Sequence, residues 1–159
     1  MKTLVVYDSL FDNTRHIAVA IAEVFRRYGA TQLASASDVG VSDLKAYNVL
    51  LFGCPTQRHK ASPAMQALLE HLPRNILRGQ SVAAFDTRYK MSEFLSGSAA
   101  HIIARKLKRT GATLLMPAES FFVSGREGPL EPGELDRAML WAEQLVMHCP
   151  LKNLSGEQA

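Results

Sequence analysis

Cysteine is scarce in this sequence: the two present, Cys54 and Cys149, lie far apart and belong to no CxxC pair. Disulfide frameworks and zinc sites of small proteins need several closely spaced cysteines, so neither is expected. The chain also lacks an apolar run near the roughly 20 residues that span a bilayer, and Met1 and Lys2 lead directly into a strand pattern. We therefore predict reduced thiols, no metal site, no membrane span and a cytoplasmic location.

Charge of one sign is not concentrated either. Lys and Arg number 18 against 15 Asp and Glu, which gives a net charge of +3 and a pI near 9.0. The strongest basic cluster, Arg105 to Arg109, falls in the last turns of a predicted helix, where cations complement the helix dipole. It has no interleaved aromatic residues, so nucleic-acid binding is not expected. With 47% hydrophobic and 21% charged residues, the composition fits one globular domain, predicted over residues 1–150, with a C-terminal tail at 151–159.

Strand and helix patterns alternate along the chain. Apolar or β-branched segments predict five strands, at residues 3–7, 30–34, 48–53, 81–87 and 113–123, the last interrupted by Pro117. Helical periodicity predicts helices at about residues 14–28, 62–72, 98–110 and 133–149. Near-continuous apolar strands alternating with helices indicate an α/β fold, a doubly wound five-stranded parallel sheet with strand order 2-1-3-4-5.

A sheet of this order binds ligands at the carboxyl ends of its strands, where the strand order reverses, here between the first and third strands. Three loops meet there: residues 8–13, 54–61 and 86–97. The first loop is rich in hydroxyl and amide groups and opens a helix, whose free N–H groups and dipole favour an anion. It does not match the P-loop of nucleotide triphosphatases. Taken alone, helix capping without a ligand and phosphate binding are equally open for this loop.

The stretch YDSLFDNTRHIAVAI, residues 7–21, resembles the phosphate loop of the flavodoxin family, in which a hydroxyl residue precedes Asn-Thr at a helix start. The resemblance implies noncovalent FMN, with its phosphate held by Ser9, Asn13, Thr14 and the backbone of Leu10, Phe11, Asp12 and Asn13. Asp12 stands where many relatives have glycine, and its carboxylate would repel a phosphate unless it points to solvent.

The second and third loops extend the resemblance. GCPTQRHKAS, residues 53–62, is similar to the Gly-x-Pro-Thr loop of flavodoxin-like quinone reductases. That similarity implies that Pro55 and its neighbours border the flavin ring, with hydrogen bonds from Thr56 and Gln57 and with Arg58 or His59 near its reactive side. FDTRYKMSEF has the Asp-x-x-Tyr spacing of the third flavin loop of flavodoxins. It implies that Tyr89 stacks on the ring and that Asp86, Thr87 and Arg88 belong to the site.

Several alternatives follow from these patterns. The QRHK segment is also typical of a solvated, mobile loop. Trp141 is predicted at the margin of the last helix's apolar face, either at the edge of the core or on an oligomer surface. Arg126, in the turn-rich segment 124–134, either reaches a partner or the site or belongs to a loop that caps the last helix.

We expect an FMN protein that transfers electrons, as a carrier or as a small reductase. The predicted partner is a redox protein or a small acceptor such as a quinone, and the oligomeric state is not predicted. A quinone or porphyrinogen oxidoreductase is an enzymatic alternative. A cofactor-free flavodoxin-like interaction module is the alternative from another class.

Overall fold

Six parallel strands lie at the centre of the computed structural model, which describes residues 1–150; the predicted tail at 151–159 lies outside the described residues. The strands are β1 (Lys2–Tyr7), β2 (Ala30–Ser35), β3 (Val49–Pro55), β4 (Ser81–Tyr89), β5 (Thr113–Leu114) and β6 (Glu119–Val123). Their order is β2-β1-β3-β4-β5. β5 pairs with the start of β4, and β6 pairs with the later part of the same strand. β5 and β6 thus share one edge position, which confirms the predicted order and the interruption near Pro117.

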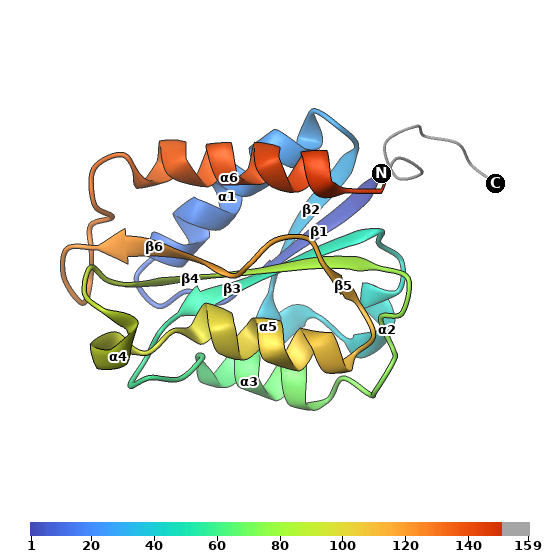
Figure 1. Ribbon diagram of the computed structural model, residues 1–159, viewed down its shortest axis with the longest axis horizontal. Coiled ribbons are helices and arrows are strands. Elements are labelled where there is room, and N and C mark those ends of the chain that lie inside the picture. Colours follow the sequence, from blue (N-terminus) through green and yellow to red (C-terminus); the bar gives the residue numbers. More distant parts are fainter. Residues whose placement is uncertain (151–159) are drawn as a thin grey trace.

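Helices cover both faces of the sheet (Figure 1). α1 (Asn13–Arg26) and α6 (Glu134–His148) cover one face, and α3 (Pro63–Glu70) and α5 (Ala99–Arg109) cover the other. Side chains alternate along each strand: Val5 packs toward α1 and α6, whereas Leu4 and Val6 pack toward α3 and α5. Because both faces are buried, the strands read as continuous apolar runs.

Three short elements were not predicted: the 3-10 helix η1 (Ala36–Asp38), α2 (Val41–Leu44) and α4 (Glu93–Ser96). Each spans about one turn, which is too short for a helical period to show in the sequence. α4 follows β4 directly and contributes to the third of the predicted site loops. Within residues 1–150, no helix is long and apolar enough to span a bilayer.

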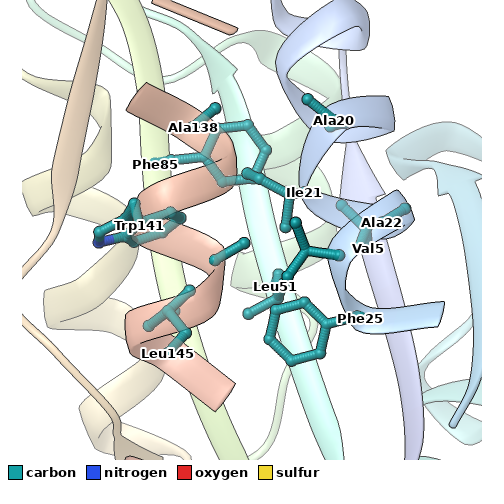
Figure 2. Packing of buried hydrophobic residues seen from close by; sticks show 14 of the residues in the cluster. Val5, Ala20, Ile21, Ala22, Phe25, Leu51, Phe85, Ala138, Trp141 and Leu145 are labelled. Atoms are coloured by element: carbon teal, nitrogen blue, oxygen red, sulfur yellow. The ribbon is translucent and has the colours of Figure 1, made fainter. Parts of the chain in front are cut away.

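Trp141 lies inside the core between the sheet and α6, and Figure 2 shows it close to Phe85. Its ring is 6.2 Å from Phe85 and 5.9 Å from Phe121, both edge to face. Only 4% of Trp141 is exposed, so the alternative of an oligomer surface at this residue was wrong. The helical wheel misplaced it because β6 extends the sheet sideways, so that Phe121 of β6 lies next to Phe85 of β4 and both pack on the flank of α6.

The outer edge of β6 is capped by the start of α6. Glu134 Oε2 accepts a hydrogen bond from the Phe122 N–H at 2.8 Å, and Arg137 donates to the Ser120 carbonyl. Arg137 also pairs with Glu134 at 2.6 Å and with Glu119 at 3.1 Å. Burial alone would raise the pKa of Glu134, but hydrogen bonds from Arg137 and Phe122 outweigh it and lower that pKa. These side chains satisfy edge groups that would otherwise be open to another strand.

The chain starts and α6 ends on the same side of the molecule, where the strands begin (Figure 1). The β4–α4 connection lies on the opposite side, where the strands end. The loops predicted to form the site therefore lie far from both ends of the described chain.

Candidate functional site

A cavity of about 1060 Å³ lies at the carboxyl ends of β1, β3 and β4. All three predicted loops line it, together with Val123 and Arg126 from the far end of the chain. The strand order reverses between β1 and β3, as expected for a ligand site in a doubly wound sheet.

The loop before α1 presents unpaired backbone donors. Asp12 occupies the N-cap position with a φ of 64° and makes no side-chain cap. Within residues 1–150, the N–H groups of Leu10 through Thr14 have no hydrogen-bond acceptor, whereas the Arg15 N–H contacts Ser9 Oγ at 3.4 Å. A helix start that lacks its side-chain cap and borders a cavity is suited to bind an anion.

Two buried hydroxyls lie behind this loop. Thr14 Oγ1 at the start of α1 and Thr87 Oγ1 near the end of β4 are 2.8 Å apart, and both residues line the cavity. One hydroxyl donates to the other, so one proton of the pair remains free. The pair joins the first loop to the third and adds a neutral donor beside the free N–H groups.

A fourth segment, residues 124–130, contacts the first loop. Asn13 Nδ2 donates to the Glu127 carbonyl at 3.1 Å. Gly128 has a φ of 103°, and a Cβ at that position would lie 2.6 Å from Asn13 Oδ1. The backbone at Glu127 and Gly128 therefore lies directly against the Asn13 side chain.

Thr56 and Asp86 form a buried support under the second loop. Asp86 Oδ2 accepts hydrogen bonds from Thr56 Oγ1 at 3.1 Å, Ser98 Oγ at 2.7 Å and the Ala100 N–H at 2.9 Å. The Ala99 N–H in turn donates to Thr56 Oγ1 at 2.9 Å. Burial raises the pKa of Asp86, and the hydrogen bonds from Ala100, Ser98 and Thr56 offset only part of this effect. Asp86 thus acts behind the cavity by fixing Thr56, which lines it.

Residues 57–60 form a tight two-residue turn at the cavity. Gln57 and Lys60 exchange backbone hydrogen bonds of 2.8 and 2.9 Å. Arg58 and His59 between them have φ values of 47° and 66°. Two consecutive positive φ values characterise a type I′ turn, which favours Asn-Gly because a larger side chain costs about 1–2 kcal/mol in this region. The QRHK segment is an ordered turn that stores strain beside the cavity.

Cys54 lies under the same loop, and its thiol is expected to be unreactive. Its sulfur accepts a hydrogen bond from the Ser62 N–H at 3.5 Å, and the side chain is fully buried. Burial raises the pKa of Cys54 to about 12, so the thiol stays protonated at neutral pH. A protonated, buried thiol is a poor nucleophile and metal ligand.

Arg88 holds the third loop in place. Its guanidinium donates to Ser120 Oγ at 2.9 Å, to the Met91 carbonyl at 2.7 Å and to Ser96 Oγ at 3.0 Å. It also lies 5.1 Å from the centre of the Phe122 ring. These contacts join β4, β6 and α4 around a buried cation at the cavity wall.

The cavity lining is positively charged. Among the described residues, it includes Arg58, Lys60, Arg88 and Arg126 and no Asp or Glu. The mouth is apolar: Leu10, Phe11, Tyr89, Met91 and Leu95 line the cavity and are exposed, and Phe94 beside them is 92% exposed. This combination suits a ligand that is both anionic and aromatic.

Every predicted site residue except Asp12 and Asp86 lines the cavity. Asp12 is exposed and contributes backbone to the loop, and Asp86 is buried behind it. The lining also includes Arg126, for which a place at the site was one of the open alternatives, and residues that were not predicted individually: Lys60, Ala61, Pro63, Gln66, Met91, Leu95, Ser96 and Val123. Most belong to the predicted loops or follow them directly; only Val123 and Arg126 come from a separate part of the chain. Within residues 1–150, no cluster of three or more His, Cys, Asp or Glu could hold a metal ion.

Comparisons with known proteins identify the family of the chain. A flavodoxin of Maridesulfovibrio salexigens is 30% identical over 119 residues, which cover 72% of this chain and 81% of that protein. The oxidised flavodoxin 2 of Bacillus cereus has a TM-score of 0.81 at 19% identity, covering 92% of this chain and 99% of that chain. A flavodoxin from the domain Archaea has a TM-score of 0.71 at 25% identity, with the same coverage. The flavodoxin family model matches residues 5–141, and the chain therefore belongs to the flavodoxin family.

Proposed function

We propose that this flavodoxin-family protein binds FMN noncovalently in the cavity at the carboxyl ends of β1, β3 and β4 and uses it to transfer electrons. The observation that carries the proposal is an uncapped helix start, with N–H groups unpaired within residues 1–150, at a cavity whose lining from the same residues has four cations and no carboxylate. Adenine and nicotinamide dinucleotides would call for a glycine-rich fingerprint that the chain lacks.

The phosphate is assigned to the first loop. Ser9, Asn13 and Thr14 supply side-chain donors, and the free N–H groups of residues 10–14 supply the rest. Thr87 supports Thr14 through their shared hydrogen bond and supplies a further hydroxyl. The exposed carboxylate of Asp12 lies off the cavity lining, so it does not compete for these donors.

The flavin ring is assigned to the second and third loops. Pro55, Thr56 and Gln57 line the cavity, and Tyr89, which also lines it, provides an aromatic face. When bound, FMN supplies the ability to accept and release one or two electrons. Arg58 and Arg88 line the same cavity and would favour added negative charge, because nearby cations stabilise anions; His59 lines it as well.

The partner is proposed to approach the apolar mouth of the cavity. Exposed Met91, Phe94 and Leu95 project from the turn after β4 and from α4. Exposed apolar side chains gathered in one segment are typical of a contact surface. It suits docking of a redox protein or entry of a small aromatic acceptor such as a quinone. A cytoplasmic location stays a prediction from the sequence.

The decisive experiment is to purify the protein, record its absorbance spectrum and identify the flavin released on denaturation. Yellow protein that releases FMN is expected, or colourless protein that binds added FMN. A colourless protein that binds no added FMN would reject the proposal and favour the cofactor-free module.

The source of electrons that reduces the flavin distinguishes a carrier from a reductase. If the loaded protein is reduced by NADH or NADPH and then reoxidised by a quinone, it is a reductase. If neither nicotinamide reduces it but dithionite does, the carrier function is favoured.

A further inference from the structure

Residues 124–130 form a loop that leaves the sheet at the end of β6 and returns to pair with it at Leu130. Val123 and Leu130 pair as an isolated bridge, and the Ser124 N–H donates to the Pro129 carbonyl at 2.9 Å. The Gly128 N–H donates to the Gly125 carbonyl at 3.1 Å. Internal hydrogen bonds hold the position of this segment, which we call the 124–130 loop.

The tip of the 124–130 loop borders the start of α1. Asn13 donates to the Glu127 carbonyl, and Gly128 lies so close to the Asn13 amide that a side chain there would collide with it. Arg126 is the residue before Glu127 and lines the same cavity as Asn13. Its backbone therefore adjoins the residue that contacts Asn13 at the helix start.

Arg126 differs from the other cations of the lining. Arg58 and Lys60 belong to the second loop, and Arg88 is occupied by Ser120, Met91 and Ser96. Arg126 is exposed and makes no hydrogen bond or ion pair with another residue in 1–150. The other side-chain donors at the helix start that line the cavity, on Ser9, Asn13 and Thr14, are uncharged, and Arg15 in the first turn of α1 is exposed and does not line the cavity.

We infer that Arg126 forms an ion pair with the phosphate of the bound flavin, so that the 124–130 loop makes the site selective for a phosphorylated flavin. A guanidinium offers two parallel N–H donors, which match two oxygens of a phosphate. The Asn13–Glu127 contact fixes the loop against the helix start, so the arginine needs little ordering on binding. This inference rests on the proposed function, because it requires the phosphate to lie at the start of α1.

The test compares FMN with riboflavin, which has the same ring and no phosphate. Dissociation constants are measured by quenching of flavin fluorescence for the wild-type protein and for Arg126→Gln. We expect Arg126→Gln to weaken the binding of FMN about 10-fold and to leave the dissociation constant of riboflavin unchanged. The salt dependence of FMN binding should also become less steep, since one ion pair is lost.

Glu127→Gln is the matched control, because it changes the charge of an exposed neighbour on the same loop whose side chain does not line the cavity. It should leave the affinity for riboflavin unchanged, and the affinity for FMN should be unchanged or slightly higher. Circular dichroism of both variants checks that the fold is intact.

The outcomes distinguish this inference from the proposed function. If Arg126→Gln leaves FMN affinity unchanged, or weakens FMN and riboflavin equally, the ion pair is rejected while the flavin site stands. If the wild-type protein binds neither flavin, the proposed function fails and the inference fails with it.

Discussion

The Thr56 hydroxyl lies 3.1 Å from the carboxylate of Asp86, and the two residues come from neighbouring strand ends of the sheet. Asp86 also accepts from Ser98 and from the Ala100 N–H at the start of α5. One buried carboxylate thus fixes a residue of the cavity wall and the start of a helix at the same time.

Asp86→Asn should remove a pH dependence from stability. The folded protein raises the pKa of Asp86 above its ordinary value of 3.8, so it binds this proton more tightly than the unfolded chain does. The contribution of Asp86 is therefore most favourable below the unfolded pKa and falls as pH rises through the folded pKa. Between the unfolded-state and folded-state pKa values of Asp86, the free energy of unfolding of the wild-type protein should fall by up to about 1.4 kcal/mol per pH unit relative to that of Asp86→Asn.

Urea unfolding at several pH values from acid to neutral measures this difference. Asp12→Asn serves as the control, since Asp12 is exposed and off the cavity lining. Wild-type and Asp86→Asn curves that stay parallel across the range would show that Asp86 does not titrate differently in the folded state.

Asp12→Gly should leave FMN affinity within about twofold of wild type, because the carboxylate does not line the cavity. Stability should also change little. Glycine tolerates the φ of 64° better than aspartate, but it loses more conformational entropy on folding. Asn13→Asp is the contrasting variant, since it puts a carboxylate on the lining one residue along and should weaken FMN strongly. A several-fold gain in affinity for Asp12→Gly would instead mean that its carboxylate reaches the phosphate.

The double variant Arg58→Asn, His59→Gly should stabilise the protein. Asn and Gly are preferred in type I′ turns, so the substitutions relieve the strain of two positive φ values. Part of this gain is offset because glycine loses more conformational entropy on folding. We expect a net gain of about 1 kcal/mol in the free energy of unfolding. Thermal and urea unfolding of the double and single variants would test it, and unchanged or lower stability would contradict the assignment of strain.

Glu134→Gln should weaken the cap on β6. The substitution keeps an acceptor for the Phe122 N–H but loses the charge paired with Arg137, so we expect a loss of about 1–2 kcal/mol at neutral pH. Because folding lowers the pKa of Glu134 below 4.5, this stabilisation is present above that value and disappears as pH falls through the folded pKa.

Asp136→Asn is the control for Glu134→Gln, since Asp136 is exposed in the same first turn of α6 and shares any helix-dipole effect. Both variants are compared with wild type by urea unfolding at neutral and acidic pH. An equal loss in the two variants would assign the effect to the dipole rather than to the edge of β6.

The fold was predictable because both faces of the sheet are covered, which leaves long apolar strands separated by amphipathic helices. The site loops were predictable for the same reason, since the order of elements fixes which loops meet where the strand order reverses. The orientation of Asp86 was not. Asp86 lies inside the predicted strand, but the strand pattern does not show that its side chain turns away from the cavity toward Ser98 and the Ala100 N–H.

Arg126 and Trp141 show a different limit. Their surroundings come from residues distant in sequence: Asn13 contacts the 124–130 loop next to Arg126, and Phe85 packs on Trp141. A local pattern reports the period of one element, but it does not report which distant element lies beside it. The type I′ turn at Arg58 and His59 was missed because the residues contradict the usual preference for Asn-Gly.

The positions of Met1 and the end of α6, together on the side away from the cavity, have a practical consequence (Figure 1). A linker joined at either position would hold the molecule on an electrode or a bead with the mouth of the cavity facing the bulk liquid. Immobilised protein should then exchange electrons with dissolved acceptors as freely as it does when untethered. Attachment through Lys60 or Lys90, near the mouth, should obstruct that exchange.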